Sequence, residues 1–499
     1  MNSKTKVVIA GGGTAGWLSA YSLVSRLGNV LDVTLVESDQ IGTIGVGEAT
    51  IPTMRSFHRL IGIDEQEFMA ATQATFKLGI EFENWGQQGD SYFHSFGEIG
   101  KRSWMAEFHE FWMEAKAQGF GGSLEDYCLE LKAAKANKFA TNTGKNAGNT
   151  AVNYAFHFNA TAYAGYLRTK SEAAGVKRQE GKITQVGKDN SGNITTLTLD
   201  NGAVVDGEVF IDCTGFRALL IGEHLGVGYE DWSHYLAADS AIAVQTKSIE
   251  NPVPYTKAIA HSSSWQWRIP LQSRVGNGLV YSSKFLSDDE AKSTLMANLT
   301  GEPLTEPRKL SFTTGRREKA WHKNCIAIGL ASGFLEPLES TSIHLVTTAL
   351  LRLMKLFPFS GEHELLAKQY NQEAELELET VRDFIILHYH LTERNDSPFW
   401  QHYRNMEIPE SLAHRMAIFS ENGYVWPDDV GLFRVDSWVQ VMMGQGLMPK
   451  QHHQGSAVIP TQGLKEQLAA LRNMIANSVA QLPEHADFIQ QYCPAKSPS

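Results

Sequence analysis

Hydrophobic and polar positions along the first 40 residues predict a strand, a glycine turn, a helix and a second strand. Residues 7–10 are apolar, residues 11–16 contain four glycines, and an apolar helical pattern then runs to residue 27. Residues 32–36 are again strand-like and end at Glu37. This order is typical of a βαβ unit that binds a dinucleotide at its glycine turn.

The turn has the spacing Gly-x-Gly-x-x-Gly, and each glycine has a physical reason to be there. Gly11 would permit the tight turn, Gly13 would let the backbone approach a pyrophosphate, and Gly16 would let the helix pack closely. Glu37 follows about 20 residues after the last of these glycines, where an acidic side chain binds a ribose hydroxyl. The strand, the helix and the acidic residue all match the dinucleotide-binding pattern. We therefore expect a dinucleotide site and not only a structural turn.

Two later segments repeat the pattern of an apolar strand that runs into a glycine turn, at residues 209–215 and 325–333. We expect both to return to the sheet formed by the first strands, since a doubly wound sheet collects strands from distant parts of a chain. Residues 182–199 read as a hairpin, and helical periodicity recurs at residues 363–394 and 463–482. The sequence therefore predicts an α/β fold with a discontinuous, Rossmann-like nucleotide module and a second, mainly α-helical module.

Composition narrows the class of protein. The chain has 499 residues, of which 42% are hydrophobic and 20% charged, as in folded domains. Its formal net charge of −11 argues against a nucleic-acid partner. The four cysteines are scattered without a CxxC pair, which disfavours a zinc site and a disulfide framework, and the first apolar run is too short for a signal or membrane segment. We expect a cytoplasmic protein with no metal site and no membrane partner.

Three further motifs form a specific combination: residues 45–52 (GVGEATIP), residues 265–270 (WQWRIP) and residues 334–341 (FLEPLEST). With the glycine turn they make the sequence resemble the flavin-dependent halogenases typified by tryptophan halogenases, from residue 6 to about residue 449. The resemblance implies the FAD-binding framework of hydroxylase-type flavoproteins. The cofactor-binding positions that it implies are Gly11, Gly13, Thr14, Ala15, Gly16, Glu37, Gly47, Ala49, Gly215, Gly329 and Leu338.

The resemblance also divides the chain into two modules. Residues 1–100, 151–220 and 305–350 would form the FAD-binding module. Residues 101–150, 221–304 and 351–499 would form the substrate-binding module.

Two residues correspond to the catalytic pair of these halogenases. In the family, reduced FAD, oxygen and halide generate hypohalous acid, which travels through a tunnel to a lysine, while a glutamate takes up the proton of the ring. These residues map onto Lys77 and Glu339. Lys77 has apolar neighbours in sequence, and burial there would lower its pKa, although a lysine that reaches the surface is the alternative from local sequence alone.

Halide in the family is bound by backbone N–H groups just after the catalytic glutamate, which here means Thr341 and Ser342. Many relatives have glycine at the second position. Because a side chain there changes the space for the halide, the choice between chloride and bromide stays open.

The motif WQWRIP would separate the flavin from the substrate. Trp265 and Trp267 alternate, so on a strand both point to one face. The resemblance assigns this face, with Ile269 and Pro270, to screening the flavin. Two ordinary core tryptophans are the alternative.

Substrate binding maps onto His94 and Phe96, which match an aromatic pair that sandwiches the substrate ring, and more weakly onto Trp438. Enzymes that act on free tryptophan have a tyrosine pair in the C-terminal region, and residues 433–453 contain no tyrosine. We therefore expect an uncharged, electron-rich ring such as an indole or phenol.

The prediction is thus a two-component halogenase whose reduced FAD comes from a separate flavin reductase, since no second dinucleotide site for NAD(P)H is visible. A homodimer is compatible with the sequence. The alternatives are a flavin monooxygenase that hydroxylates or epoxidises its substrate, and a flavin-binding protein without catalysis.

Overall fold

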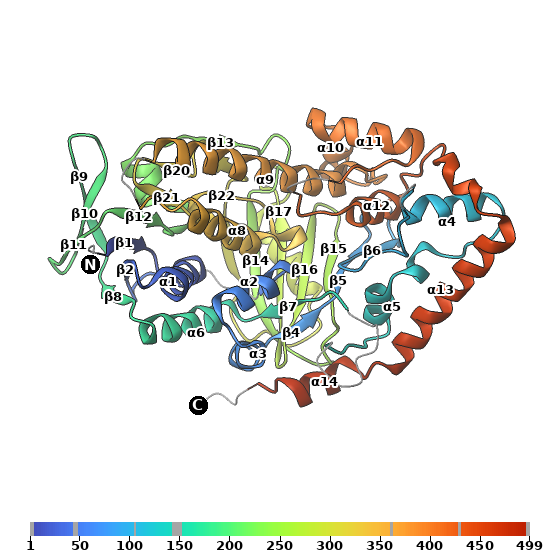
Figure 1. Ribbon diagram of the computed structural model, residues 1–499, viewed down its shortest axis with the longest axis horizontal. Helices are drawn as coiled ribbons and strands as arrows, with labels where there is room; N and C mark the ends of the chain where they lie inside the picture. Colours follow the sequence, from blue (N-terminus) through green and yellow to red (C-terminus); the bar gives the residue numbers. More distant parts are fainter. Residues whose placement is uncertain are drawn as a thin grey trace.

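The computed structural model describes residues 4–42, 48–103, 106–141, 152–359, 363–427 and 431–495. Two large sheets organise these residues (Figure 1). Helices lie beside and between the sheets, and the predicted α/β fold class is confirmed.

The first sheet has six strands and forms around the N-terminal strand. Its order is β20 (Trp321–His322), β21 (Cys325–Ala327), β12 (Val209–Asp212), β1 (Thr5–Ala10), β2 (Leu31–Glu37) and β8 (Lys177–Glu180). β1 pairs in parallel with β2 and β12, and β12 pairs in parallel with β21. Both distant segments therefore return to this sheet, as the sequence predicts.

The inner strands β1, β12 and β21 of this sheet are mainly apolar and buried. The last four residues of β1 are buried, which is typical of a parallel sheet with both faces covered. α1 (Thr14–Leu27) packs beside α6 (Ala160–Ala173), and α8 (Ser342–Lys355) packs against α1. The predicted hairpin is present as β9 (Ile183–Lys188) and β10 (Ile194–Leu199), with β11 (Val204–Asp206) added at its edge.

The second sheet has seven strands, lies at the centre of Figure 1 and is mostly antiparallel. Its order is β18 (Arg308–Ser311), β14 (Ser240–Lys247), β17 (Arg274–Tyr281), β16 (Ser264–Pro270), β15 (Thr256–Ala260), β5 (Gly79–Glu83) and β6 (Ser91–Ser95).

This sheet changes the expected content of the second module. Residues 221–304 were expected in a mainly helical module, but they contain β13 to β17 and only one α-helix, α7 (Asp288–Ala297). Strands from residues 79–95, placed in the first module by sequence, complete the same sheet. The division of the chain into modules stays a prediction.

Two small sheets join the large ones. One consists of β3 (Glu48–Ala49), β7 (Ala155–Phe158) and β4 (Thr75–Lys77), and the other of β13 (Tyr229–Asp231), β19 (Gly315–Arg317) and β22 (Gly333–Phe334). The remaining helices are α2 (Thr53–Ile61), α3 (Glu65–Thr72), α4 (Phe108–Ala117), α5 (Leu129–Lys135), α9 (Glu364–His390), α10 (Pro398–Asn405), α11 (Glu410–Asn422), α12 (Val435–Gly444), α13 (Thr461–Gln481) and α14 (His485–Tyr492).

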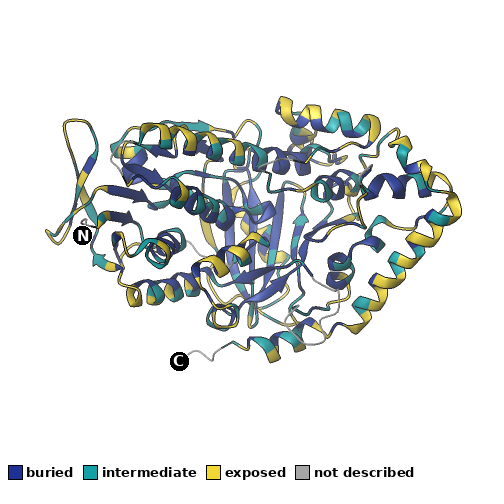
Figure 2. Cartoon of the chain, viewed as in Figure 1, coloured by how far each residue is buried: buried dark blue, intermediate teal, exposed yellow. Residues whose placement is uncertain are grey.

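The helix α9 changes character along its length. Its N-terminal half alternates between exposed and buried residues, whereas residues 381–389 are all buried. Figure 2 shows most of the strands near the centre of the molecule in dark blue, in contrast to the yellow residues along α13. The C-terminal half of α9 therefore lies inside the core, where its polar side chains need partners within the protein.

The four cysteines, Cys128, Cys213, Cys325 and Cys493, are buried and free. Burial raises the pKa of Cys213 to about 12, so that its thiol stays protonated and unreactive at neutral pH. Among the described residues, no helix is long and apolar enough to cross a membrane.

We predict that Gly11→Ala destabilises the protein by about 1–3 kcal/mol, since a left-handed backbone is strained for other residues. Gly11 has a φ of +105°, and a Cβ there would collide with the carbonyl of Cys213. The midpoint of thermal unfolding without ligand measures the effect. Gly13→Ala is the matched control, since a Cβ at Gly13 meets nothing within 4 Å. Equal midpoints for the two variants would contradict the assigned role of Gly11.

Candidate functional site

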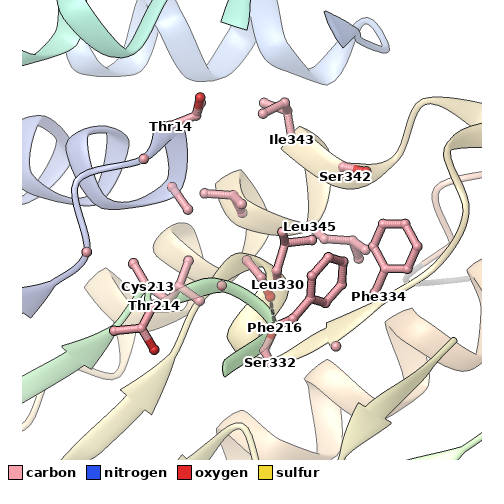
Figure 3. A pocket seen from close by; sticks show the side chains of 18 of the residues that line it. Thr14, Cys213, Thr214, Phe216, Leu330, Ser332, Phe334, Ser342, Ile343 and Leu345 are labelled. Atoms are coloured by element: carbon pink, nitrogen blue, oxygen red, sulfur yellow. Dashed lines mark hydrogen bonds between the residues drawn. The ribbon is translucent and has the colours of Figure 1, made fainter. Parts of the chain in front are cut away.

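A cavity of about 840 Å³ opens where the parallel strands of the first sheet end. Figure 3 shows Thr14 at the start of α1, Cys213 and Thr214 after β12, and Ser342 at the start of α8 around it. The predicted cofactor residues that line it are Gly11, Gly13, Thr14, Ala15, Glu37, Ala49, Gly215, Gly329 and Leu338. Gly16 does not line it, and Gly47 lies outside the described residues.

The glycine turn leaves the start of α1 open towards this cavity. No side chain caps the helix, and its first turn contains no acidic residue, so its N–H groups face the cavity without a side-chain acceptor. A Cβ at Gly16 would collide with the carbonyl oxygen of Gly11, so Gly16 serves close packing. Gly12, which sequence reasoning passed over, leaves room for the carboxylate of Glu37.

Glu37 lies at the carboxyl end of β2, and a basic residue fixes its orientation. Nε of Arg178 donates to its Oε1 at 2.7 Å, and the indole N–H of Trp17 donates to Oε2 at 3.3 Å. The second oxygen lies against Gly12 at the cavity. The glycine turn and the open start of α1 fit the phosphates of a dinucleotide such as FAD, and the oriented carboxylate of Glu37 fits one of its riboses.

The strand β16 forms part of the far wall of the cavity. Trp265, Trp267 and Ile269 line it, as their alternation predicts, whereas Pro270 does not. The side chain of Trp267 occupies the space where Gly278 on β17 has no Cβ.

The buried carboxylate of Glu336 accepts a hydrogen bond from Trp265 in the cavity wall. Its Oε2 accepts from the indole N–H of Trp265 at 3.4 Å and from the hydroxyl of Tyr389 at 3.0 Å. Burial raises the pKa of Glu336 to about 7 in spite of these donors. Local sequence does not predict this role, because Tyr389 lies 53 residues further along the chain, on α9.

Lys77 lies on β4 and is completely buried, as its apolar neighbours predict. Its Nζ donates to Ser340 Oγ at 2.8 Å and to the carbonyl oxygen of Thr50 at 3.2 Å, and lies 5.1 Å from the ring centre of Phe96. Burial lowers its pKa from 10.5 to about 7, although the charge of Glu339 acts in the opposite direction. A substantial share of the amine is therefore uncharged at neutral pH.

Glu339 ends the short 3-10 turn Pro337–Glu339 and is also completely buried. Nδ1 of His94 donates to its Oε2 at 2.8 Å and lies 3.0 Å from Oε1, and Nε2 of His388 lies 2.8 Å from Oε1. Burial acts to raise the pKa of Glu339, but its electrostatic and N–H contacts with His94 and His388 hold it at about 2. Glu339 is thus an ionised base across the physiological range.

Ser340 joins the two catalytic candidates. It has a φ of +59°, a left-handed conformation that is strained for a serine, and its hydroxyl contacts Lys77 while its neighbour in sequence is Glu339. Neither Lys77 nor Glu339 lines the large cavity, but Ser340 does. The catalytic candidates therefore lie behind the wall, one residue from the cavity.

The predicted substrate residues lie around this buried pair. The rings of His94 and Phe96 are 6.5 Å apart at 78°, so in this structure they do not form two parallel faces. Trp438 on α12 is buried edge-on against Phe384, with ring centres 4.8 Å apart. Phe384 stacks on Phe433 at 3.7 Å.

Sequence reasoning missed Phe384, Phe433 and His388. The position of His388 on a helical face was visible in the sequence, but nothing in its local pattern distinguished it from a core residue.

The predicted halide residues begin α8. Ser342 lines the cavity, and Thr341 is buried with its hydroxyl unpartnered. The helix has no side-chain cap and no acidic residue in its first turn. Its positive end is thus open to an anion. Within the described parts of the chain, no group of three or more His, Cys, Asp or Glu side chains is arranged to hold a metal ion.

We predict that Lys77→Met stabilises the protein most at and below pH 7. Between about pH 7 and 10.5 the unfolded chain binds a proton that folded Lys77 has released, so this residue makes stability rise with pH across that window. Replacing it by an apolar side chain removes a cost on the order of 4 kcal/mol at pH 7. The difference in unfolding midpoint between variant and parent should shrink from pH 6 to pH 10.

Lys257→Met is the control for this pH series. Lys257 lies partly exposed on β15 and pairs with Glu83 at 2.6 Å. Its replacement should produce no such gain at low pH. A difference for Lys77→Met that does not vary with pH would contradict the depressed pKa.

Known proteins resemble this chain over its whole length. The family model described as tryptophan halogenase matches residues 6–461. The tryptophan 7-halogenase of Lentzea aerocolonigenes is 33% identical, with 97% of this chain and 98% of that protein covered. A flavin-dependent halogenase structure from Xanthomonas campestris shares 51% identity and a TM-score of 0.96, with 100% of both chains covered. A second one, from Brevundimonas sp. BAL3, shares 42% identity and a TM-score of 0.94, with 98% and 99% covered.

These similarities confirm the predicted family and do not favour a hydroxylating monooxygenase or a flavin protein without catalysis. The chain belongs to the tryptophan halogenase family and is an FAD-dependent halogenase, an oxidoreductase that acts on an aromatic substrate.

Proposed function

We propose that this halogenase passes hypohalous acid from the large cavity to Lys77 and uses Glu339 as the base for an indole-type or phenolic ring. The observation that carries the proposal is the position of the Lys77–Ser340–Glu339 cluster, buried behind the wall of the cavity and reached through Ser340. A reactive oxidant would thus form on one side of a protein wall and act on the other.

The large cavity would hold FAD with its phosphates at the glycine turn and a ribose at Glu37. When bound there in reduced form, FAD would supply two electrons to oxygen, which takes two more from halide, so that hypohalous acid and water form. The wall of the cavity opposite the parallel sheet would consist of Trp265, Trp267 and Ile269. This wall would keep the substrate apart from the flavin.

Halide would bind at the start of α8. The open N-terminus supplies N–H groups and a positive dipole end, and the unpartnered hydroxyl of Thr341 supplies one more donor. Ser342 adds a side chain at the cavity surface, where it limits the space beside the anion.

Lys77 would hold the electrophilic halogen. Its uncharged amine either donates a hydrogen bond to hypohalous acid or replaces the hydroxyl, forming an N–halogen bond with water as the leaving group. When the ring carbon takes the halogen, its C–H bond breaks, the proton passes to Glu339, and the electron pair restores the aromatic ring.

The substrate would be an uncharged, electron-rich ring, bound among the aromatic side chains of Phe96, Phe384, Phe433 and Trp438. Related enzymes are named as tryptophan halogenases. Residues 433–453 of this chain have no tyrosine, however, which supports a substrate without the charged groups of a free amino acid.

Reduced FAD would come from a separate flavin reductase by diffusion. Four free, buried thiols agree with the reducing conditions of a cytoplasmic enzyme.

We predict that Lys77→Ala and Glu339→Gln each lower halogenation by about 10²–10⁴-fold, the range for loss of a positioned acid–base group. The assay combines the enzyme with a flavin reductase, NADH, FAD, bromide and a panel of indoles and phenols, and measures halogenated product by mass and isotope pattern. Oxidation of reduced FAD should continue in both variants, because neither residue lines the FAD cavity.

Lys257→Ala serves as the control, since it removes a lysine from the neighbouring strand β15 without touching the site. Parent-level product from Lys77→Ala would refute the proposed route of the halogen. Absence of product from the parent enzyme across the whole panel would refute the proposed substrate class.

We predict that Ser342→Gly raises the ratio of brominated to chlorinated product about 2- to 10-fold, less than 1.4 kcal/mol of discrimination. The change removes a side chain from the proposed halide position and leaves more room for the larger anion. Competition between equal concentrations of the two halides measures it. Ser332→Ala is the control, because Ser332 lines the same cavity but donates to Gly329. An unchanged ratio would place the halide elsewhere.

A further inference from the structure

Tyr92 and His388 form a buried chain that ends on the carboxylate of Glu339. The hydroxyl of Tyr92 lies 2.6 Å from Nδ1 of His388, and Nε2 of His388 lies 2.8 Å from Oε1 of Glu339. On the other side, His94 donates to Oε2. All four side chains are less than 5% exposed.

The charge of Glu339 fixes which nitrogen of His388 carries the proton. Glu339 is ionised, so a lone pair on Nε2 at 2.8 Å from its oxygen would be repelled. Nε2 therefore carries the proton, and in the neutral imidazole Nδ1 is the acceptor for the hydroxyl of Tyr92. Tyr92 thus donates to the tautomer of His388 that Glu339 selects.

Packing prevents His388 from turning away. Its ring stacks on Phe82 at 4.5 Å, and Phe82 in turn stacks on Tyr92 at 4.8 Å. The edge of Phe384 closes another side, with ring centres 5.2 Å apart. The side-chain amide of Gln445 donates to the backbone carbonyl of His388 at 2.9 Å.

The contact between His388 and Glu339 is close but not well directed. Nε2 has no hydrogen bond of good angle, so in this structure the interaction is mainly electrostatic. The titratable groups that face Glu339 are His94 and Tyr92 on β6, His388 on α9 and Lys77 on β4. His388 is the one of these groups that α9 contributes.

We propose that Tyr92 and His388 are positioning residues of the halogenation reaction, which keep Glu339 ionised and oriented to receive the ring proton. The inference rests on the proposed role of Glu339 as the base. In the step itself, the C–H bond of the halogenated ring carbon breaks, its proton goes to a carboxylate oxygen of Glu339, and the electron pair returns to the ring. His388 and Tyr92 hold their own protons throughout.

Loss of the imidazole would leave Oε1 of Glu339 with only its 3.0 Å contact to Nδ1 of His94. A buried carboxylate that loses a donor becomes easier to protonate, and a protonated Glu339 cannot act as the base. The predicted defect is therefore greatest at low pH, which a general loss of packing would not produce.

The test is the pH dependence of halogenation, from pH 5.5 to 9, for His388→Phe, His388→Gln and Tyr92→Phe, with reduced FAD supplied in excess. His388→Phe should lose more activity at pH 6 than at pH 8.5. His388→Gln keeps an N–H donor near the position of Nε2 and should restore most of the activity at pH 6. Tyr92→Phe should show a smaller loss in the same direction.

A second buried tyrosine–histidine pair supplies the matched control. Nε2 of His58 lies 2.7 Å from the hydroxyl of Tyr163, away from Glu339. His58→Phe and Tyr163→Phe remove the same groups and should leave the pH profile of the parent unchanged, whatever they do to the unfolding midpoint.

The outcomes separate the two proposals. Activity retained by Glu339→Gln would overturn the base role itself. Suppose that Glu339→Gln is inactive, that Tyr92→Phe has the pH profile of the parent, and that the loss in His388→Phe does not depend on pH. This result would overturn only the positioning role. If His388→Phe does not fold, Tyr92→Phe decides, because it removes one hydroxyl and keeps the stacked ring.

Discussion

Burial of a lysine and a glutamate beside the same serine is the constraint on which the rest of the site depends. Removing two charged groups from water costs several kcal/mol each unless other groups replace the solvent. Here Thr50, Ser340, His94 and His388 do so. These partners come from four separate parts of the chain, so the site exists only when the whole fold is assembled.

The two sheets explain how a reactive oxidant and its target can be kept apart. The parallel sheet ends at the cavity with the glycine turn, and the mostly antiparallel sheet supplies the wall through β16. The segment that follows β22 runs between them, with Leu338 and Ser340 on the cavity and Glu339 behind it. Neighbouring residues of this segment thus lie on opposite sides of the cavity wall.

The helix α9 connects the wall to the base. Tyr389 holds Glu336, which accepts from Trp265, and the preceding residue, His388, lies against Glu339. Because the C-terminal half of this helix is buried on every side, its polar residues find their partners in the protein, and both partners are acids of the same short segment. One turn of this helix therefore contacts both the cavity wall and the base.

The sequence by itself determined the features that depend on local pattern: the βαβ unit with Gly11 and Glu37, the returning strands, the alternation of Trp265 and Trp267, and the apolar setting of Lys77. Only the tertiary structure decided the seven-stranded sheet and the contacts of His94 and His388 with Glu339. The physical reason is the distance along the chain between the residues that interact. Periodicity and turn chemistry act between near neighbours, whereas the charge of Glu339 is stabilised by side chains about 50 and 245 residues away, whose meeting no local pattern encodes.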